Sequence, residues 1–321
     1  MTTIGIDVSK RKLDVSILLE SSKISYKVFE NNFQGFKNFH SWLLRLGISQ
    51  AHVCLEATGC YGEELSLFLY EHGYRVSVVN PARIKAYARS EGCRVKTDKV
   101  DSAVIARFCK AQCPALWVPP SLSEQTLKDL YRCRQNLLMD KNRITNRLES
   151  LMRKQDSIKI WKNLLSSIEA QIKEVDQQVT NLLQNDQGLR KQVDLLKTIP
   201  GVSDQTAIAV LSELPPIKSF NNAKEVAAFA GLTPFEKQSG SSLKSKGRLS
   251  KTGNSQLRKA LYMPTIVAKR YNPLLQSFCQ RLSSKGKPTM VVIAAGMRKL
   301  LHIIFGVLKT QNPFTFSEKG A

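Results

Sequence analysis

The stretch TTIGIDVSKRKLDVSILLE, residues 2–20, decides the fold of the first part of the chain. It contains two short runs rich in Ile, Val and Leu, TTIGIDV and KLDVSILLE, which a brief polar break separates. Runs of this kind are typical of β-strands, and so short a break suits a hairpin. A third run, KISYKVFE at 23–30, follows another polar break. We therefore predict three consecutive antiparallel strands.

Helical and strand patterns alternate after these three strands. The periodicity and the breaking residues predict a helix at 33–46, a strand at 51–57, a helix at 60–73 and a strand at 74–80. Two further helices are predicted, one from Pro81 and one from Asp98. Because parallel crossovers are right-handed, the order βββαβαβα predicts a mixed five-stranded sheet in which the first strand lies beside the fourth.

Four acids fall at places that this topology brings together. Asp7 ends the first strand and Glu56 ends the fourth, at the sheet edge where α/β proteins bind their ligands. Asp98 and Asp101, in KTDKVDSA at 96–103, project from one side of the first turns of the next helix. Four carboxylates in one pocket repel one another, and divalent cations that prefer oxygen ligands, such as Mg²⁺, would offset the repulsion.

Each acid also has a plainer interpretation. Asp7 would cap a turn, Glu56 would pair with a lysine, and Asp98 would cap its own helix. Two neighbouring acids, Asp14 and Glu63, are interpreted as surface residues. The metal site is therefore predicted from the convergence of four acids, because no single acid would be enough to indicate it.

The net charge of the chain points to polyanionic partners. Its 321 residues include 48 Lys and Arg against 26 Asp and Glu, a formal charge of +22 that is spread along the sequence. This favours DNA or RNA over an acidic membrane surface. The seven Cys form no CxxC pair, which is typical of buried thiols in a reducing compartment. The start lacks the order of a signal peptide, and charged residues interrupt the apolar stretch 290–308, so we expect a cytoplasmic protein without a membrane partner.

Residues 121–187 predict a coiled-coil region. Apolar residues recur in steps of three and four from 158 to 182, and every seventh residue from 130 to 151 is apolar. The pattern predicts two long antiparallel helices joined near 153–157. Either the partner helix of the same chain or a helix of a second chain would fill the seam.

The C-terminal part is predicted to be helical with loops. LLKTIPGVSDQTAIAVLSEL at 195–214 suggests a helix-hairpin-helix whose turn amides would face a phosphate, although Ser203 stands where a second glycine is usual. The segment 237–259 has seven basic residues and no acid. A solvated linker is the plainer interpretation, but the segment lies between two apolar helices, which favours a loop that tracks phosphates. Its predicted nucleic-acid-binding residues are Lys237, Lys244, Lys246, Arg248, Lys251, Arg258 and Lys259.

The ordered motifs together resemble one known family. GIDVSKRKLDV, CLEATGCY, KTDKVDSAVIARFC, IPGVSDQTA and FAGLTPFEKQSGSS are similar to the DEDD transposases of bacterial insertion-sequence family one-ten, the bridge-RNA-guided recombinases. The resemblance implies a RuvC-like, RNase H-fold N-terminal domain with Mg²⁺ as cofactor. It also implies that the catalytic, metal-binding acids of this domain are Asp7, Glu56, Asp98 and Asp101.

The resemblance further implies a serine nucleophile in a C-terminal transposase domain. Within QSGSS the matching residue is Ser239, with Ser241 and Ser242 as alternatives; without the resemblance, QSGSS would be interpreted as a flexible linker. The implied reaction is cleavage of a DNA strand to form a phosphoserine link, followed by transfer to the partner strand. A serine hydroxyl needs activation for this reaction, which metal-polarised phosphate and nearby basic side chains would supply.

We therefore predict an α/β domain followed by all-α regions. The predicted parts are a RuvC-like domain at 1–118, a coiled-coil helical hairpin at 119–190 and a helical transposase domain at 191–321. The expected partners are donor DNA, target DNA, a structured noncoding bridge RNA and further copies of the chain, as a homodimer and as a tetramer at the synapse. The competing hypotheses are a metal-dependent junction-resolving endonuclease that uses no serine, and a DNA-bending or RNA-chaperone protein without enzymatic activity.

Overall fold

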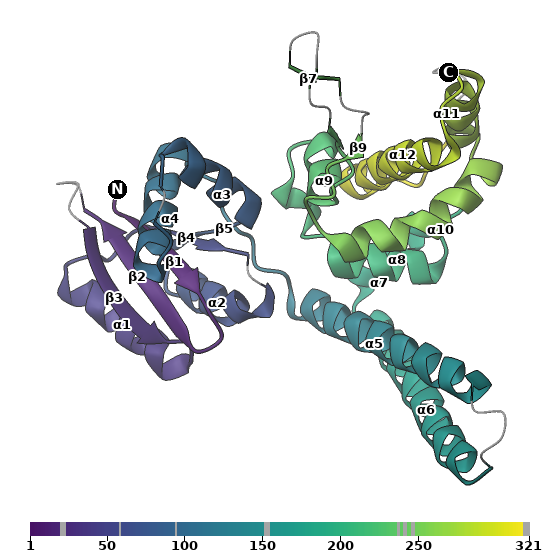
Figure 1. Ribbon diagram of the computed structural model, residues 1–321, viewed down its shortest axis with the longest axis horizontal. Helices are drawn as coiled ribbons and strands as arrows, with labels where there is room; N and C mark the ends of the chain where they lie inside the picture. Colours follow the sequence, from purple (N-terminus) through teal and green to yellow (C-terminus); the bar gives the residue numbers. More distant parts are fainter. Residues whose placement is uncertain are drawn as a thin grey trace. The chain divides into compact units, whose positions relative to one another are not determined.

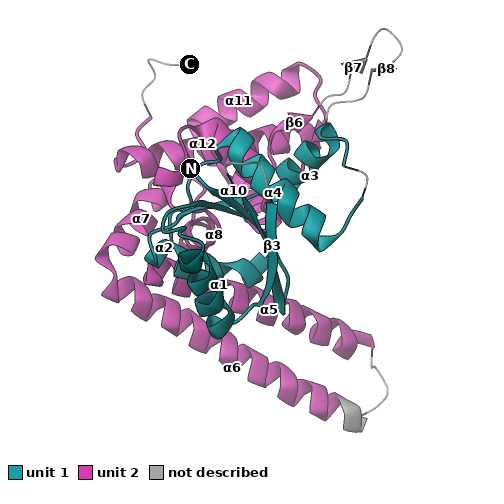
Figure 2. Cartoon of the chain, turned by 90° about the vertical axis from the view of Figure 1, so that its left-hand side faces the viewer, with its two compact units in different colours: residues 1–119 teal, residues 120–321 magenta. Residues whose placement is uncertain are grey.

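The protein is divided into two compact units, Met1–Pro119 and Pro120–Ala321 (Figure 2). The computed structural model describes residues 1–19, 24–57, 59–93, 95–150, 155–235, 238–239, 243–244 and 248–316. The first unit is a sheet flanked by helices, and the second is mostly helical. This confirms the predicted fold class, an α/β part followed by helical regions.

The first unit contains a five-stranded sheet of order β3-β2-β1-β4-β5. Its strands are β1 (Thr3–Val8), β2 (Lys12–Leu18), β3 (Ile24–Glu30), β4 (His52–Glu56) and β5 (Arg75–Val79). β2 pairs antiparallel with both β1 and β3, whereas β4 pairs parallel with both β1 and β5. This is the RNase H-like arrangement, and it confirms that the first strand lies beside the fourth.

Helices cover both faces of this sheet (Figure 1). They are α1 (Phe33–Arg45), α2 (Glu63–Glu71), α3 (Pro81–Ser90) and α4 (Asp98–Gln112), with a 3-10 turn η1 (Gly59–Gly62) before α2. One face packs against α1 and α2 through a core that includes Ile4, Ile6, Leu13, Val15, Phe36, Phe39 and Leu65. α4 crosses the opposite face over β1, β2 and β4. Since side chains alternate along a strand, the residues between those core positions face α4.

α4 approaches β1 closely because Gly5 has no side chain. A Cβ atom at Gly5 would lie 2.2 Å from the backbone nitrogen of Ala106 and 2.2 Å from the carbonyl oxygen of Ser102. At the same interface, the buried hydroxyl groups of Ser16 and Ser102 are 2.8 Å apart. The position of α4 on the sheet therefore depends on a glycine and on a hydrogen bond between two serines.

The second unit is mostly helical in the part that the structure describes. Its helices are α5 (Leu122–Ser150), α6 (Gln155–Asn185), α7 (Gln187–Lys197), α8 (Asp204–Glu213), η2 (Ile217–Ser219), α9 (Ala223–Phe229), α10 (Ser255–Tyr271), α11 (Pro273–Ser284) and α12 (Thr289–Thr310). Between α9 and α10 lie the short strands β6 (Pro234–Phe235), β7 (Gln238–Ser239), β8 (Leu243–Lys244) and β9 (Arg248–Leu249). The strands are an addition to the prediction, which had only a loop there.

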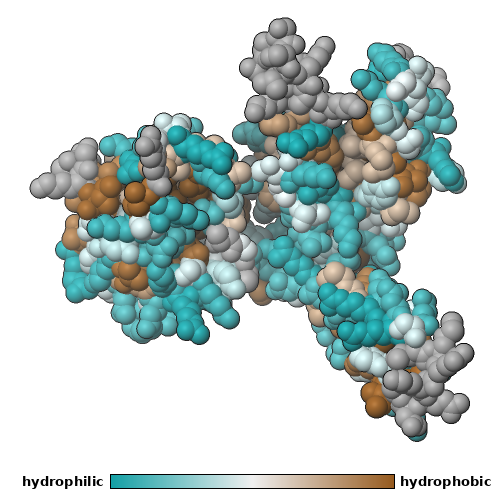
Figure 3. All heavy atoms as spheres, viewed as in Figure 1, coloured by the Kyte–Doolittle hydropathy of each residue, from teal (hydrophilic) through white to brown (hydrophobic). Residues whose placement is uncertain are grey.

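α5 and α6 form an antiparallel hairpin. Arg134 Nε of α5 lies 2.6 Å from Asp176 Oδ1 of α6, and Lys141 Nζ lies 2.8 Å from Glu169 Oε1. The buried apolar residues on the two helices include Ile144, Ile168, Val175 and Val179. A helix of the same chain therefore fills the predicted seam, and hydrophilic side chains cover most of the hairpin surface in view (Figure 3). α5 is described up to Ser150 and α6 from Gln155, and residues 153 and 154 of the predicted junction lie outside the described residues.

α12 is the central helix of the core of the second unit. Among the described residues it is the one helix long and apolar enough to cross a membrane by length and composition. It packs against α7, α9, α10 and α11, and its Leu300, Leu301 and Ile304 are completely buried. Its apolar composition is therefore accounted for by its place inside this unit.

Candidate active site

Asp7 and Glu56 lie at the ends of neighbouring parallel strands. Ile6 of β1 is paired with Leu55 of β4, so the next residues along the two strands are Asp7 and Glu56. Both residues occupy the alternate positions that face α4, whereas Ile6 and Leu55 belong to the core on the opposite face. The predicted topology therefore brings these two carboxylates to one end and one face of the sheet.

The first turn of α4 carries the other two predicted acids. Thr97 caps this helix, because its side-chain oxygen accepts a hydrogen bond from the backbone nitrogen of Val100 at 3.3 Å. Asp98 and Asp101 follow inside the first turn, where the helix dipole favours negative charge. The plainer interpretation of Asp98 as the cap of its own helix is thus wrong, since Thr97 has that role.

The raised pKa of Asp7 shows that the four acids lie in one region of the structure. Burial is the largest cause that raises the pKa of Asp7 to about 6, and the negative charges of Asp101, Asp98 and Glu56 follow in that order. Burial also raises the pKa of Glu56, and the charge of Asp101 adds to the effect. Charges perturb one another in this way only when they are close in space. The structure therefore brings together all four acids that the sequence singled out.

Asp14 belongs to the same site, although it was interpreted as a surface residue. Its side chain is only 2% exposed, and in the antiparallel register it lies directly opposite Asp7. The hydroxyl of Tyr26 donates to Asp14 at 2.5 Å, and Lys12 Nζ lies 3.2 Å from it. The same Nζ atom lies 2.6 Å from Asp98 Oδ2. The interpretation failed because alternate polar residues of β2 look solvent-facing in the sequence, whereas α4 covers them.

The donor set suits a divalent cation in its chemistry. Carboxylate oxygens are the ligands that Mg²⁺ prefers, and a cation would offset the repulsion that helps to raise the pKa of Asp7. Among the described residues, however, no three His, Cys, Asp or Glu side chains already stand in an arrangement that could hold a metal ion. The four carboxylates are thus close enough to perturb the pKa of Asp7, but as they lie they do not form a ready metal site. Asp98 also contacts a cation, because its Oδ2 atom lies 2.6 Å from Lys12 Nζ.

The predicted serine lies on a short hairpin in the second unit. The backbone of Ser239 in β7 pairs with that of Leu243 in β8, and Lys244 is the last residue of β8. Four other predicted residues lie outside the described part of the chain: Lys237, Ser241, Ser242 and Lys246. Ser239 therefore has a described backbone position, in a different unit from the carboxylates.

The remaining predicted basic residues flank this hairpin. The guanidinium of Arg248 lies over the ring of Phe235, at 5.4 Å from its centre. Arg258 Nη1 donates a hydrogen bond of 2.9 Å to a carbonyl oxygen just after α9. Lys251 and Lys259 are exposed. Arg258 thus has a structural role at the start of α10, while the two lysines present their charge to solvent.

α10 also borders a groove that the sequence did not indicate. The groove has a volume of about 480 Å³ and is lined by Ser255, Arg258, Lys259, Tyr262, Met263 and Met297. It combines two basic side chains with an aromatic ring, which are the groups that contact phosphates and bases. Tyr262 and Met263 lie beyond the basic run and belong to an apolar helical pattern, so only the folded structure brings them into this set.

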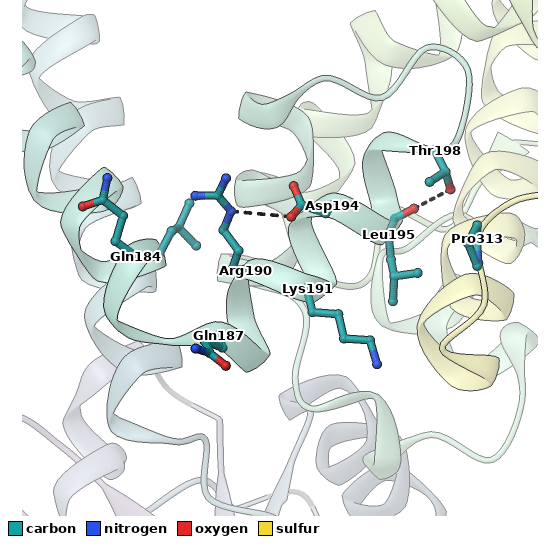
Figure 4. A pocket seen from close by; sticks show the side chains of 9 residues that line it. Gln184, Gln187, Arg190, Lys191, Asp194, Leu195, Thr198 and Pro313 are labelled. Carbon is teal, nitrogen blue, oxygen red and sulfur yellow. Dashed lines mark hydrogen bonds and ion pairs between the residues drawn. The ribbon is translucent and has the colours of Figure 1, made fainter.

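A second groove, of about 580 Å³, lies where α6 meets α7 (Figure 4). Its lining includes Arg190, Lys191 and Asp194, and Arg190 Nε lies 3.5 Å from Asp194 Oδ2. Within the part of the chain that the structure describes, none of the predicted site residues lines it. We therefore do not assign this groove to the candidate active site.

The turn between α7 and α8 explains why a serine stands at the expected glycine position. Ser203 caps α8, because its hydroxyl accepts a hydrogen bond from the backbone nitrogen of Thr206 at 3.3 Å. Gly201 has a φ of +97°, and a Cβ atom there would lie 2.7 Å from the backbone of Ala268. The turn therefore needs its first glycine for conformation and packing, and it uses the serine as a helix cap.

Known proteins resemble this chain over nearly its whole length. A model described as the transposase IS116/IS110/IS902 family matches residues 193–280, and a DEDD transposase model of the IS110 type matches residues 4–155. The pilin gene-inverting protein of Moraxella bovis is 34% identical over 322 residues, covering 98% of this chain and 97% of that protein. The pilin gene-inverting protein of Moraxella lacunata matches with the same identity and coverage. A Thermus thermophilus RuvC structure matches 36% of this chain and 99% of its own, with 15% identity and a TM-score of 0.28.

Proposed function

Because this chain belongs to the IS116/IS110/IS902 family of transposases, we propose that it is an RNA-guided DNA recombinase that exchanges strands through a phosphoserine intermediate. The observation that carries the proposal is the convergence of Asp7, Glu56, Asp98 and Asp101 at one end of the sheet. All four lie inside the region 4–155 that the DEDD transposase model matches. Mg²⁺ is the proposed cofactor.

The carboxylates would hold the metal ion and orient it toward DNA. Bound there, Mg²⁺ would polarise a phosphoryl oxygen and neutralise the charge that develops during displacement. Asp7 and Glu56 extend from paired strands, so their backbones give the site a rigid base. With its pKa at about 6, Asp7 is mostly ionised at neutral pH and is available as a ligand. Asp98 and Asp101 add two further carboxylates from the first turn of α4.

Ser239 would supply the nucleophile. Its Oγ atom forms a bond to the phosphorus as the bond to the leaving DNA oxygen breaks, and that oxygen takes up the proton that the serine loses. A hydroxyl of the partner strand then attacks the phosphoserine and releases the serine, so the number of phosphodiester bonds is unchanged. The basic segment 237–259 contains both Ser239 and the exposed Lys251, and its charge supports phosphate binding near Ser239.

The nucleic-acid partners proposed are donor DNA, target DNA and a bridge RNA that pairs with both. The formal charge of +22 suits one RNA and two duplexes together, and the groove on α10 offers Lys259 and the ring of Tyr262 to a nucleotide strand. Two relatives are named for inverting a gene, an outcome of site-specific strand exchange. We further propose that the chain acts as a homodimer that forms a tetramer at the synapse, in the bacterial cytoplasm at the nucleoid.

The second candidate is a RuvC-like endonuclease that resolves junctions with water as the nucleophile. The carboxylates of the first unit favour it, because they could support metal-dependent hydrolysis without any residue of the second unit. It leaves unexplained why residues 193–280 match a transposase model.

A comparison of serine variants separates the two candidates. The full-length chain with its RNA is incubated with labelled donor and target duplexes and Mg²⁺, and covalent adducts are resolved on denaturing gels. We expect Ser239→Ala to lose both the adduct and strand exchange, while Ser241→Ala and Ser242→Ala, as matched controls, keep both. Strand exchange by Ser239→Ala without an adduct would exclude the serine mechanism. Unchanged cleavage by Asp7→Asn would exclude both enzymes and favour the hypothesis of a non-enzymatic protein.

A further inference from the structure

Lys12 lies between two carboxylates of the candidate active site. Its Nζ atom is 3.2 Å from Asp14 Oδ2 and 2.6 Å from Asp98 Oδ2. Lys12 and Asp14 are alternate residues of β2 and therefore face the same side of the sheet, the side that α4 covers. Asp98 reaches the lysine from the first turn of α4. One ammonium group thus joins the sheet to the helix that carries half of the predicted metal ligands.

The two ion pairs of Lys12 differ in how easily they can break. The side chain of Asp14 is 2% exposed, and its other described partner is the hydroxyl of Tyr26. If Lys12 left, Asp14 would keep a buried charge without a cation, which is strongly unfavourable. The side chain of Asp98 is 53% exposed, so water can replace the lysine there at little cost. Lys12 is therefore anchored on Asp14, and Asp98 is the partner that can leave.

We propose that Lys12 is a fixed internal cation that holds Asp98 and competes with the divalent cation for this carboxylate. The inference rests on the proposed function, in which Asp98 is a metal ligand. Metal binding then includes an exchange: the Asp98 carboxylate turns from the ammonium of Lys12 to the ion, while Lys12 stays with Asp14. A positive charge that remains beside the site also repels the ion. Both effects lower the affinity of the cluster for metal, and Lys12 acts as a positioning residue.

The test measures metal binding without any nucleic acid. The full-length chain is treated with EDTA, dialysed at constant ionic strength and titrated with Mn²⁺ alone by calorimetry. We expect Lys12→Met to bind Mn²⁺ several-fold to about tenfold more tightly than the wild type, the size of the repulsion that one nearby charge exerts through water. Lys12→Arg keeps the charge, and we expect its affinity within about twofold of the wild type. Lys10→Met, which removes an equal charge from an exposed position two residues earlier, is the matched control.

A double-mutant cycle with Asp98→Asn locates the effect. If Lys12 acts through Asp98, Lys12→Met should tighten Mn²⁺ binding in the wild type and much less in the Asp98→Asn background. Lys12→Met by itself leaves the buried Asp14 without its cation. The double variant Lys12→Met, Asp14→Asn repeats the test without a buried unpaired charge, and we expect it also to bind Mn²⁺ more tightly than the wild type.

The outcomes separate this inference from the proposed function. One outcome is that Lys12→Met, alone and combined with Asp14→Asn, binds Mn²⁺ no more tightly than the wild type, while Asp98→Asn weakens binding by the wild type. This result overturns the role of Lys12 and leaves the proposed metal site intact. Tightening of the same size in Lys10→Met also overturns it, because the effect would then be one of overall charge. Absence of Mn²⁺ binding by the wild type overturns the proposed metal site and this inference with it.

Discussion

Arg132 of α5 donates two hydrogen bonds, of 3.0 and 3.1 Å, to the carboxylate of Glu213 at the end of α8. The side chain of Glu213 is completely buried, and Asn254 also donates to it at 2.8 Å. Asn254 in turn caps α10, since its side chain accepts a hydrogen bond from the backbone nitrogen of Leu257 at 2.9 Å. This network links the helical hairpin to the start of α10, which lies within the basic segment 237–259 that contains Ser239.

Removal of the arginine from this network should destabilise the second unit strongly. Arg132→Met leaves the buried carboxylate of Glu213 with an amide donor but no cation, and we expect a loss of about 3 kcal/mol in the free energy of unfolding, measured in urea. The matched control on the same helix is Arg143→Met, which breaks the exposed ion pair with Asp140 and should change the free energy by less than about 1 kcal/mol. If the two substitutions lowered the free energy of unfolding equally, a large contribution of this network to stability would be contradicted.

Gly5→Ala should disturb both stability and catalysis. The added methyl group would lie 2.2 Å from backbone atoms of α4, so the helix has to move away from β1 and take Asp98 and Asp101 with it. Overpacking of this kind costs about 1–3 kcal/mol, and we expect strand cleavage to fall more than the stability alone explains. The control is Gly62→Ala, where a Cβ atom would meet only Val8, at 4.0 Å. Full cleavage activity in Gly5→Ala would show that the close approach of α4 is not needed.

The proximity of Asp7 and Glu56 could be predicted from the sequence. Each ends a strand whose place in the sheet follows from the order of elements and the handedness of crossovers, so their meeting could be predicted. Lys12 and Asp14 could not be placed in this way. Their alternation with apolar residues reveals that β2 has two different faces, but it does not show that α4 covers the polar one.

Contacts between distant helices were harder still to predict. The spacing of apolar residues indicated α5 and α6, and it could not show whether the seam was intramolecular. Arg132 and Glu213 lie 81 residues apart and are two among many charged residues, so no local pattern marks them as partners. Ser239 was indicated by family resemblance alone, because a Gly/Ser-rich run has no periodicity from which a site could be predicted.

The EDTA-treated protein should become less stable as the pH rises from about 4 to about 6. The pKa of Asp7 is about 6 in the folded chain against 3.8 for an ordinary Asp, so in this window the folded state binds more protons than the unfolded state. The free energy of unfolding therefore falls as the pH rises through the window. Because Asp7 is only half-buried, we expect its contribution to be on the order of 1 kcal/mol.

Asp7→Asn should reduce this pH dependence, measured as the change in urea midpoint between pH 4 and pH 7. Part of the slope should remain, because the pKa values of Glu56 and Asp101 are raised as well, chiefly by burial. Glu63→Gln, at an exposed acid outside this cluster, should leave the slope as in the wild type. Parallel curves for the wild type and Asp7→Asn would contradict the raised pKa of Asp7.

Lys259 should contribute to nucleic-acid binding through its charge alone. It is exposed and lines the groove on α10, so a phosphate contact there would release about one condensed counterion. We expect Lys259→Ala to weaken binding of a DNA duplex and to reduce the slope of log K against log salt by about 0.9, with little dependence on base sequence. Lys285→Ala removes an exposed lysine just after α11 and serves as the control. If the two variants shared the same salt slope as the wild type, the groove would not be a phosphate-binding surface, and the excess charge of the chain would have to act elsewhere.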